Sequence, residues 1–139
     1  MATRGLPALQ RVPLFEGLSR RQLKRIQDLA KEVRYMEGVS IVKEGQPGDS
    51  FYVILEGQAK VKRGSRTLTK LVPGDFFGEI SLLDGGKRTA SVVSETRMVL
   101  LELTQRSFQR LLRDDPTVAL KLMEALARRV RRSERSLQD

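Results

Sequence analysis

The 139-residue sequence predicts one α+β domain over residues 1–139: an antiparallel β-roll, or jelly roll, with a helix before it, a short helix within it and two helices after it. Apolar residues recur at helical spacing near both ends of the chain. Between them, over residues 38–103, glycine or proline closes most of a series of short β-rich segments, as in a sandwich or barrel. The composition, 40% hydrophobic and 31% charged, is typical of a folded globular protein.

The first helix is expected over residues 12–34. Its apolar face follows a helical period, at Leu23, Ile26, Leu29 and Val33. Ser19 and Gln22 have the spacing of a capping box, and Leu18 can pack against Leu23 as a hydrophobic staple.

The β-roll is expected over residues 38–103. Segments such as SFYVILEG and QAKVKRG combine β-branched or aromatic residues with a closing glycine. The sequence KRGSR, residues 62–66, predicts a hairpin turn between two strands.

Two helices are expected over residues 104–139. The first has an apolar side made by Phe108, Leu111 and Leu112. Asp115 then caps a helix that begins at Pro116 and runs to about Leu137. This last helix carries a short heptad seam: Ala119, Leu122, Leu126, Val130, Ser133 and Leu137. The seam fits equally well with packing against the chain's own β-roll or with a weak homodimer through residues 116–137.

Composition also restricts the chemistry. The chain has no cysteine and no histidine, which excludes disulfides, Cys/His metal sites and cysteine nucleophiles, and removes the most common general base. No apolar run is long enough to span a membrane and no signal peptide is recognisable, so we expect a cytoplasmic protein. A net charge of +9 favours an anionic partner, but the basic residues are spread along the whole chain.

Residues 76–92, FFGEISLLDGGKRTASV, set Glu79 and Arg88 nine residues apart in an apolar stretch punctuated by glycine. A strand end and Gly78 precede a short helix, whose first amides can bind an anion. After the DGGK turn, Arg88 is expected to point back toward that helix. An arginine and converging amides suit a phosphate, and a carboxylate suits a sugar hydroxyl, which together describe a nucleotide. The alternative is a Glu79–Arg88 pair that binds no ligand.

The order FGE-I-S-L, turn, R-T-A-S-V resembles the phosphate-binding cassette of the cyclic nucleotide-binding domain family. The similarity extends over nearly the whole chain, from LFEGLS at Leu14 to the last helix, and includes EGQPGDSFYVILEGQAKV and PGDFFGE. The resemblance implies the β-roll fold with its cassette over residues 76–92, and a regulatory function.

The resemblance also implies the roles of individual residues. Glu79 would accept the ribose 2′-hydroxyl, and Arg88 would pair with the cyclic phosphate. Gly78 would let the ligand come close, and the phosphate site would be completed by the backbone amides of Ile80, Ser81 and Ala90 and the hydroxyl of Thr89. Apolar residues at the sugar and base are implied to be Val61 and Leu68, with Val42 more a core residue. Ser133 would lie where catabolite activators, one branch of the family, offer a hydroxyl to adenine.

The predicted function is therefore that of a non-enzymatic sensor for a cyclic nucleotide, cAMP in preference to cGMP, with no metal or other cofactor. We expect ligand binding to change the position of the last helix. No DNA-binding domain is expected after that helix, and the downstream protein partner is unknown from the sequence. The alternatives are a degenerate β-roll that binds only protein and, with less support in the absence of histidine, an enzyme of the cupin type.

Overall fold

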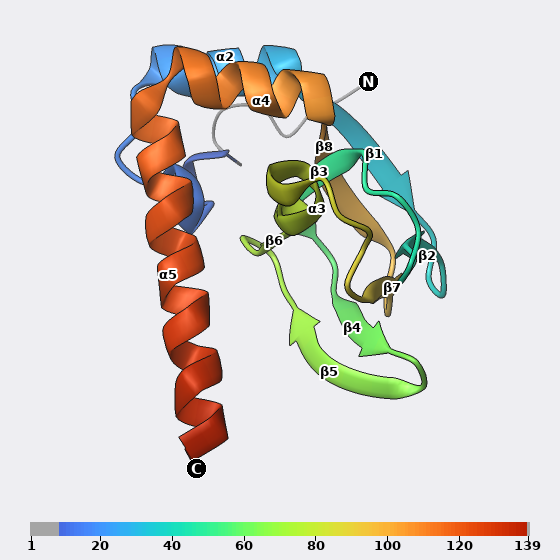
Figure 1. The fold of residues 1–139 in the computed structure, drawn as a ribbon. Coiled ribbons are helices and arrows are strands. Elements are labelled where there is room, and N and C mark those ends of the chain that lie inside the picture. The colour runs from blue at the N-terminus through green and yellow to red at the C-terminus, as the bar shows by residue number, and fades with distance from the viewer. Residues whose placement is uncertain (1–8, 139) are drawn as a thin grey trace.

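The computed structural model describes residues 9–138, and side chains as far as residue 132. Eight strands form two antiparallel four-stranded sheets that curl into a roll (Figure 1). One sheet has the order β1-β8-β3-β6, with strands Lys31–Tyr35, Met98–Thr104, Ser50–Glu56 and Phe76–Phe77. The other has the order β2-β7-β4-β5, with strands Ser40–Val42, Ser91–Ser94, Ala59–Arg63 and Arg66–Leu71. The predicted α+β class and β-roll are confirmed.

Strand β3 is buried along most of its length because both of its faces are covered. Phe51 and Val53 point toward the helices. They join one apolar cluster with residues of α2 (Arg20–Leu29), α4 (Gln105–Asp114) and α5 (Pro116–Gln138). Tyr52 and Ile54 alternate with them and fill the interior of the roll. The segment SFYVIL is therefore a nearly continuous apolar run, and the two clusters share this strand as their common wall.

The N-terminal segment is divided into a 3₁₀ turn, Pro13–Phe15, and helix α2, Arg20–Leu29. The predicted capping box is confirmed. The Ser19 hydroxyl accepts a hydrogen bond from the Gln22 amide at 3.1 Å, and the Gln22 side chain accepts one from the Ser19 amide at 2.8 Å.

The predicted extent of the first helix, residues 12–34, is wrong at both ends. Residues 31–34 belong to strand β1, which pairs with β8 from Lys31↔Glu102 to Tyr35↔Met98. Ala30 has an extended backbone and ends the helix, so Val33 lies in the sheet instead of on a helical face. The β-roll accordingly begins at residue 31 and not at 38. Pairing with a strand nearly seventy residues away outweighed the local helical period.

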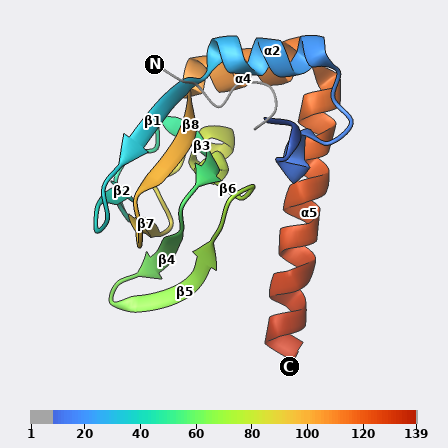
Figure 2. The same cartoon turned by 180° about the vertical axis from the view of Figure 1, so that it is seen from behind.

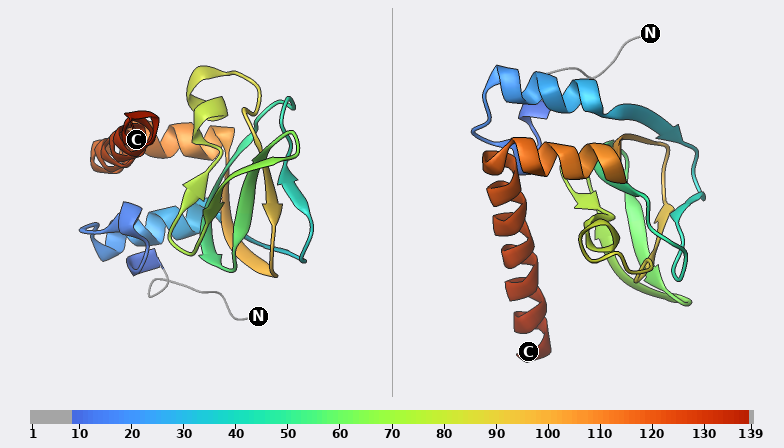
Figure 3. Two further views of the ribbon diagram at one scale, coloured as in Figure 1. Left: turned by 90° about the horizontal axis from the view of Figure 1, so that it is seen from below. Right: turned by 45° about the horizontal axis from the view of Figure 1, so that its top comes forward.

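The C-terminal helices match their prediction closely. Helix α4, Gln105–Asp114, buries Phe108 and Leu111, and α5 extends from Pro116 to Gln138 behind its Asp115 cap. Helices α2 and α4 lie side by side over one end of the roll, and α5 runs from there past the side that carries α3, Glu79–Asp84 (Figures 1 and 2). All three long helices thus lie on one side of the sheets (Figure 3).

The heptad seam of α5 is divided between two environments. Leu122 is only 4% exposed and Leu126 is partly buried, because both pack into the apolar cluster under the helices. Val130, in the second half of the seam, is 56% exposed. Two apolar residues outside the predicted seam, Leu120 and Met123, are exposed to a similar degree. The first half of the seam therefore serves the chain's own core.

Candidate functional site

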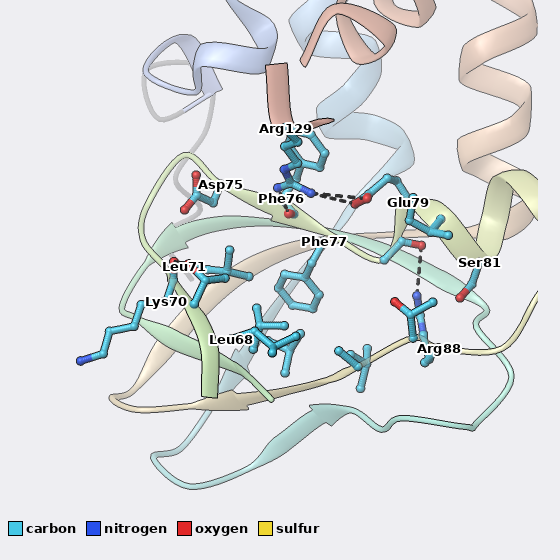
Figure 4. A pocket seen from close by; sticks show the side chains of 18 of the residues that line it. Leu68, Lys70, Leu71, Asp75, Phe76, Phe77, Glu79, Ser81, Arg88 and Arg129 are labelled. Atoms are coloured by element: carbon cyan, nitrogen blue, oxygen red, sulfur yellow. Dashed lines mark hydrogen bonds and ion pairs between the residues drawn. The ribbon is translucent and has the colours of Figure 1, made fainter. Parts of the chain in front are cut away.

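A cavity of about 790 Å³ opens between the β4–β5 hairpin, α3 and α5 (Figure 4). Its size is within the range of small-molecule sites. Most of the predicted site residues line it: Val61, Leu68, Gly78, Glu79, Ile80, Ser81, Arg88, Thr89 and Ala90. Val42 also lines the cavity while belonging to the core of the roll. The side chain of Ser133 lies outside the part of the chain that the structure describes.

Arg88 forms one wall of the cavity and is only 6% exposed. Its guanidinium donates hydrogen bonds to the Gly78 carbonyl at 3.0 Å and to the Ser50 carbonyl at 2.8 Å. Its backbone is paired with the β2–β3 loop, through Arg88 N to Gln46 O at 2.8 Å and Gly45 N to Arg88 O at 2.9 Å. As predicted, the arginine points back toward the start of α3, where neutral carbonyl groups leave its positive charge available to an anion.

Gly78 connects strand β6 to α3 with a left-handed backbone, φ +94°. A Cβ atom there would lie 2.6 Å from the Ser50 carbonyl oxygen and 2.9 Å from an Arg88 guanidinium nitrogen. Glycine is therefore required both by the backbone conformation and by the close approach of Arg88.

Glu79 is the first residue of α3 and is 4% exposed. Burial raises the pKa of this carboxyl above its ordinary value, and the positive charges of Arg129 and Arg88 oppose that shift. The carboxylate forms an ion pair with Arg129, with distances of 3.2 and 3.4 Å from one guanidinium nitrogen to the two oxygens. The simple pairing of Glu79 with Arg88 that the sequence suggested is replaced by a pairing with α5 (Figure 4).

Arg129 is the site residue that the sequence analysis missed. It also donates a hydrogen bond to the Phe76 carbonyl, and its guanidinium lies 3.8 Å from the centre of the Phe76 ring, a cation–π contact. The signal was present in the helical period, because Arg129 falls on the same face of α5 as the buried residues Val118, Leu122 and Ala125. A cation on the apolar face of a helix indicates a partner in the molecule.

Among the side chains that the structure describes, those of residues 9–132, no three acidic groups gather in a way that could hold a metal ion. None of the described helices has the length and apolarity to cross a bilayer.

Comparison with known proteins identifies the family. The model of the cyclic nucleotide-binding domain matches residues 32–115, more than half of the chain.

The chain belongs to the cyclic nucleotide-binding domain family.

One relative is a CRP-like cAMP-activated global transcriptional regulator of Mycobacterium tuberculosis, 30% identical over 136 residues. The alignment covers 94% of this chain and 61% of that regulator, so the chain spans less than two thirds of its length. The crystal structure of the Thermus thermophilus catabolite activator protein is 34% identical and superposes with a TM-score of 0.82, covering 91% of this chain and 62% of that one. The structure of Sp-2Cl-cAMPS bound to PKAR CBD2 is 26% identical and superposes with a TM-score of 0.78, covering 94% of this chain and 85% of that one. These relatives are regulatory proteins, and the family resemblance drawn from the cassette sequence is confirmed.

Proposed function

We propose that this chain is a non-catalytic sensor that binds a cyclic nucleotide, cAMP in preference to cGMP. The observation that carries the proposal is the meeting of a buried guanidinium, Arg88, and a buried carboxylate, Glu79, at one cavity of about 790 Å³. A cyclic phosphate can pair with the arginine, and a ribose 2′-hydroxyl can donate to the carboxylate. The two charges together match the two polar ends of one ligand.

The cavity then has a phosphate end and a sugar end. We define the phosphate end as Arg88 with the cassette groups around it: the amides of Ile80, Ser81 and Ala90 and the hydroxyl of Thr89. The sugar end is Glu79, and the apolar residues Val61 and Leu68 lie across the cavity, where sugar and base can pack. Gly78 lies between the two ends and carries no side chain that would press on the Arg88 guanidinium, and its backbone is proposed to let the ligand come close.

The preference for cAMP rests on the family resemblance, which puts Ser133 where catabolite activators offer a hydroxyl to adenine; the side chains of Ser133 and of its acidic neighbour Glu134 lie outside the described residues. Calorimetric titration with cAMP and cGMP tests the whole proposal. We expect both to bind and cAMP to bind more tightly. A tighter constant for cGMP would reverse the assignment, and no binding of either would favour the degenerate protein-interaction module.

Helix α5 is proposed to be the output of the sensor. Arg129 joins this helix to the sugar end, so a ligand hydroxyl that engages Glu79 changes the contacts that hold α5. The exposed side chains of Ile80 and Leu83 on α3 offer further apolar surface on which α5 can repack. Hydrogen exchange should show better protection of residues 116–137 with cAMP. Protection that rises only at the cassette would show binding without this switch.

A second copy of the chain is proposed as a weak or ligand-dependent partner of α5. The exposed apolar residues Leu120, Met123 and Val130 are spaced by three and seven, as on one face of a heptad helix. Arg128 and Arg131 beside them are exposed and repel a second copy, which keeps the dimer weak. Sedimentation at increasing concentration, with and without cAMP, should show a dimer fraction that decreases in a Met123→Glu variant. A monomer under all conditions would contradict this part of the proposal.

A further inference from the structure

The loop between β2 and β3 packs directly onto the phosphate end. Pro47 forms an antiparallel bridge with Lys87, and the Gln46 carbonyl accepts a hydrogen bond from the Arg88 amide. Just beyond the loop, the Ser50 carbonyl accepts one from the Arg88 guanidinium at 2.8 Å. This segment therefore holds Arg88 through both its backbone and its guanidinium.

Gly48 lies at the point of closest approach between this loop and the cassette. A Cβ atom built on Gly48 would lie 2.3 Å from Ser81 Cβ, 2.7 Å from Ser81 Oγ and 2.9 Å from Arg88 Cζ. All three distances are shorter than non-bonded atoms tolerate. Gly48 is not among the glycines with positive φ, so its backbone would accept alanine. Lack of space is therefore the only reason for glycine at position 48, whereas Gly78 is required by its left-handed backbone as well.

Neither neighbour can easily yield to an added methyl group. Ser81 is 3% exposed and lies in the middle of α3, next to the buried Leu82. The Arg88 guanidinium is held by two backbone carbonyl groups. Both labelled side chains lie together at the same end of the cavity in Figure 4. A side chain at position 48 would therefore push α3, Arg88 or both out of place.

We infer that Gly48 is a positioning residue for the phosphate end: its missing side chain lets Ser81 and Arg88 take the places from which they meet the cyclic phosphate. This inference depends on the proposed function, because the groups that it positions are the proposed phosphate ligands. It adds the β2–β3 loop to the elements that shape the phosphate end, beside α3 and residues 88–90. Gly48 itself does not line the cavity.

The geometry predicts a compensating pair. Gly48→Ala should weaken cAMP binding at least about tenfold, because the phosphate groups would no longer converge. Ser81→Gly removes the two atoms nearest to the new methyl group, Ser81 Cβ and Oγ. The double variant, Gly48→Ala with Ser81→Gly, should recover most of that lost affinity.

Calorimetry with cAMP on the wild type, both single variants and the double variant tests the inference. Gly86→Ala is the matched control, since its Cβ would meet only the Asp84 side chain, at 3.1 Å or more. We expect wild-type affinity for the control and recovery in the double variant. Unchanged affinity in Gly48→Ala, or a double variant as weak as Gly48→Ala, would overturn the inference.

Two further measurements separate positioning from general loss of structure. In an Arg88→Ala background, Gly48→Ala should cost less affinity than in the wild type, because one of the two groups that it displaces is absent; a loss as large as in the wild type would count against the inference. Thermal unfolding without ligand should show a lower Tm for Gly48→Ala and recovery in the double variant. If the wild type binds neither cAMP nor cGMP, the proposed function fails, whereas this ligand-free recovery still decides whether Gly48 and Ser81 form the packing pair.

Discussion

The phosphate end and the sugar end of the cavity differ in which part of the molecule holds them. Arg88 is held within the roll and its cassette, by the carbonyl groups of Gly78 and Ser50 and by the β2–β3 loop. Glu79 is held by Arg129, which comes from a helix that follows the roll. Both side chains are almost fully buried, but Arg129 itself is 30% exposed.

This difference separates preorganisation from coupling. A group fixed by several backbone carbonyls keeps its place whether or not α5 moves, so the phosphate end is ready for a ligand. A buried carboxylate whose partner is on another element reports the position of that element. In the proposed function, one end of the cavity would supply affinity, and the other would connect ligand occupancy to α5.

The largest effect is expected for Arg88→Ala. A charge-assisted hydrogen bond contributes roughly 1.5–3 kcal/mol, so the affinity for cAMP should fall at least about tenfold. The stabilisation by ligand, about 2.7 kcal/mol for the wild type at 100 times its Kd, should fall by at least about 1.3 kcal/mol at the same cAMP concentration. Calorimetry and thermal melts with and without cAMP measure the two quantities.

Lys87→Ala is the control for Arg88→Ala, because it removes a neighbouring exposed positive charge that does not line the cavity. It should bind cAMP like the wild type. Equal affinity in the wild type and Arg88→Ala would disprove the role of the phosphate end.

Arg129→Ala is expected to have a smaller effect on the affinity for cAMP. It should specifically weaken the coupling between ligand binding and helix α5. The variant leaves Glu79 buried without its ion pair, and we expect a loss of stability of about 1 kcal/mol, since the arginine is partly solvated. With cAMP, hydrogen exchange should still show protection of the cassette but no longer of residues 116–137.

Arg128→Ala provides the matched comparison on the same helix, where the side chain is exposed. It should retain the protection of α5 by cAMP. If Arg129→Ala retains that protection as well, the sugar end does not couple the ligand to α5 through this arginine.

The smallest effect on affinity is expected for Glu79→Gln. The amide oxygen still accepts the ribose hydroxyl proton, so the loss should be less than about tenfold. The stability of the ligand-free protein should increase, because the variant no longer buries a carboxylate whose pKa is raised by desolvation.

The pH dependence of that stability has a definite sign. Between the ordinary and the raised pKa of Glu79, the native state binds more protons than the unfolded state, so the free energy of unfolding falls as pH rises. Ligand-free Glu79→Gln should therefore have a higher Tm than the wild type at pH 7, and this advantage should shrink below the ordinary carboxyl pKa. A lower Tm at pH 7 would mean that the Arg129 pair outweighs the desolvation of the carboxylate.

Much of the fold could be predicted because its signals are local. The Ser19–Gln22 capping box, the KRGSR hairpin and the Asp115–Pro116 helix start each depend on a few neighbouring residues, and all three are observed. Residues 31–34 could not be assigned in this way. Their helical period continues that of α2, and only pairing with β8 makes them a strand.

The sequence by itself determined the order and the chemistry of the cassette: Gly78, Glu79 and Arg88 occur at spacings that a strand, a short helix and a turn bring to one cavity. Tertiary structure decided the partners of these residues. Glu79 pairs with Arg129, fifty positions later, and Gly48 meets Ser81 and Arg88 across a loop. Periodicity and capping act over a few residues, whereas contacts between distant segments depend on how whole elements pack. The sequence could therefore suggest which ligand to propose for the cavity, but only the packed molecule shows what holds each charge in place.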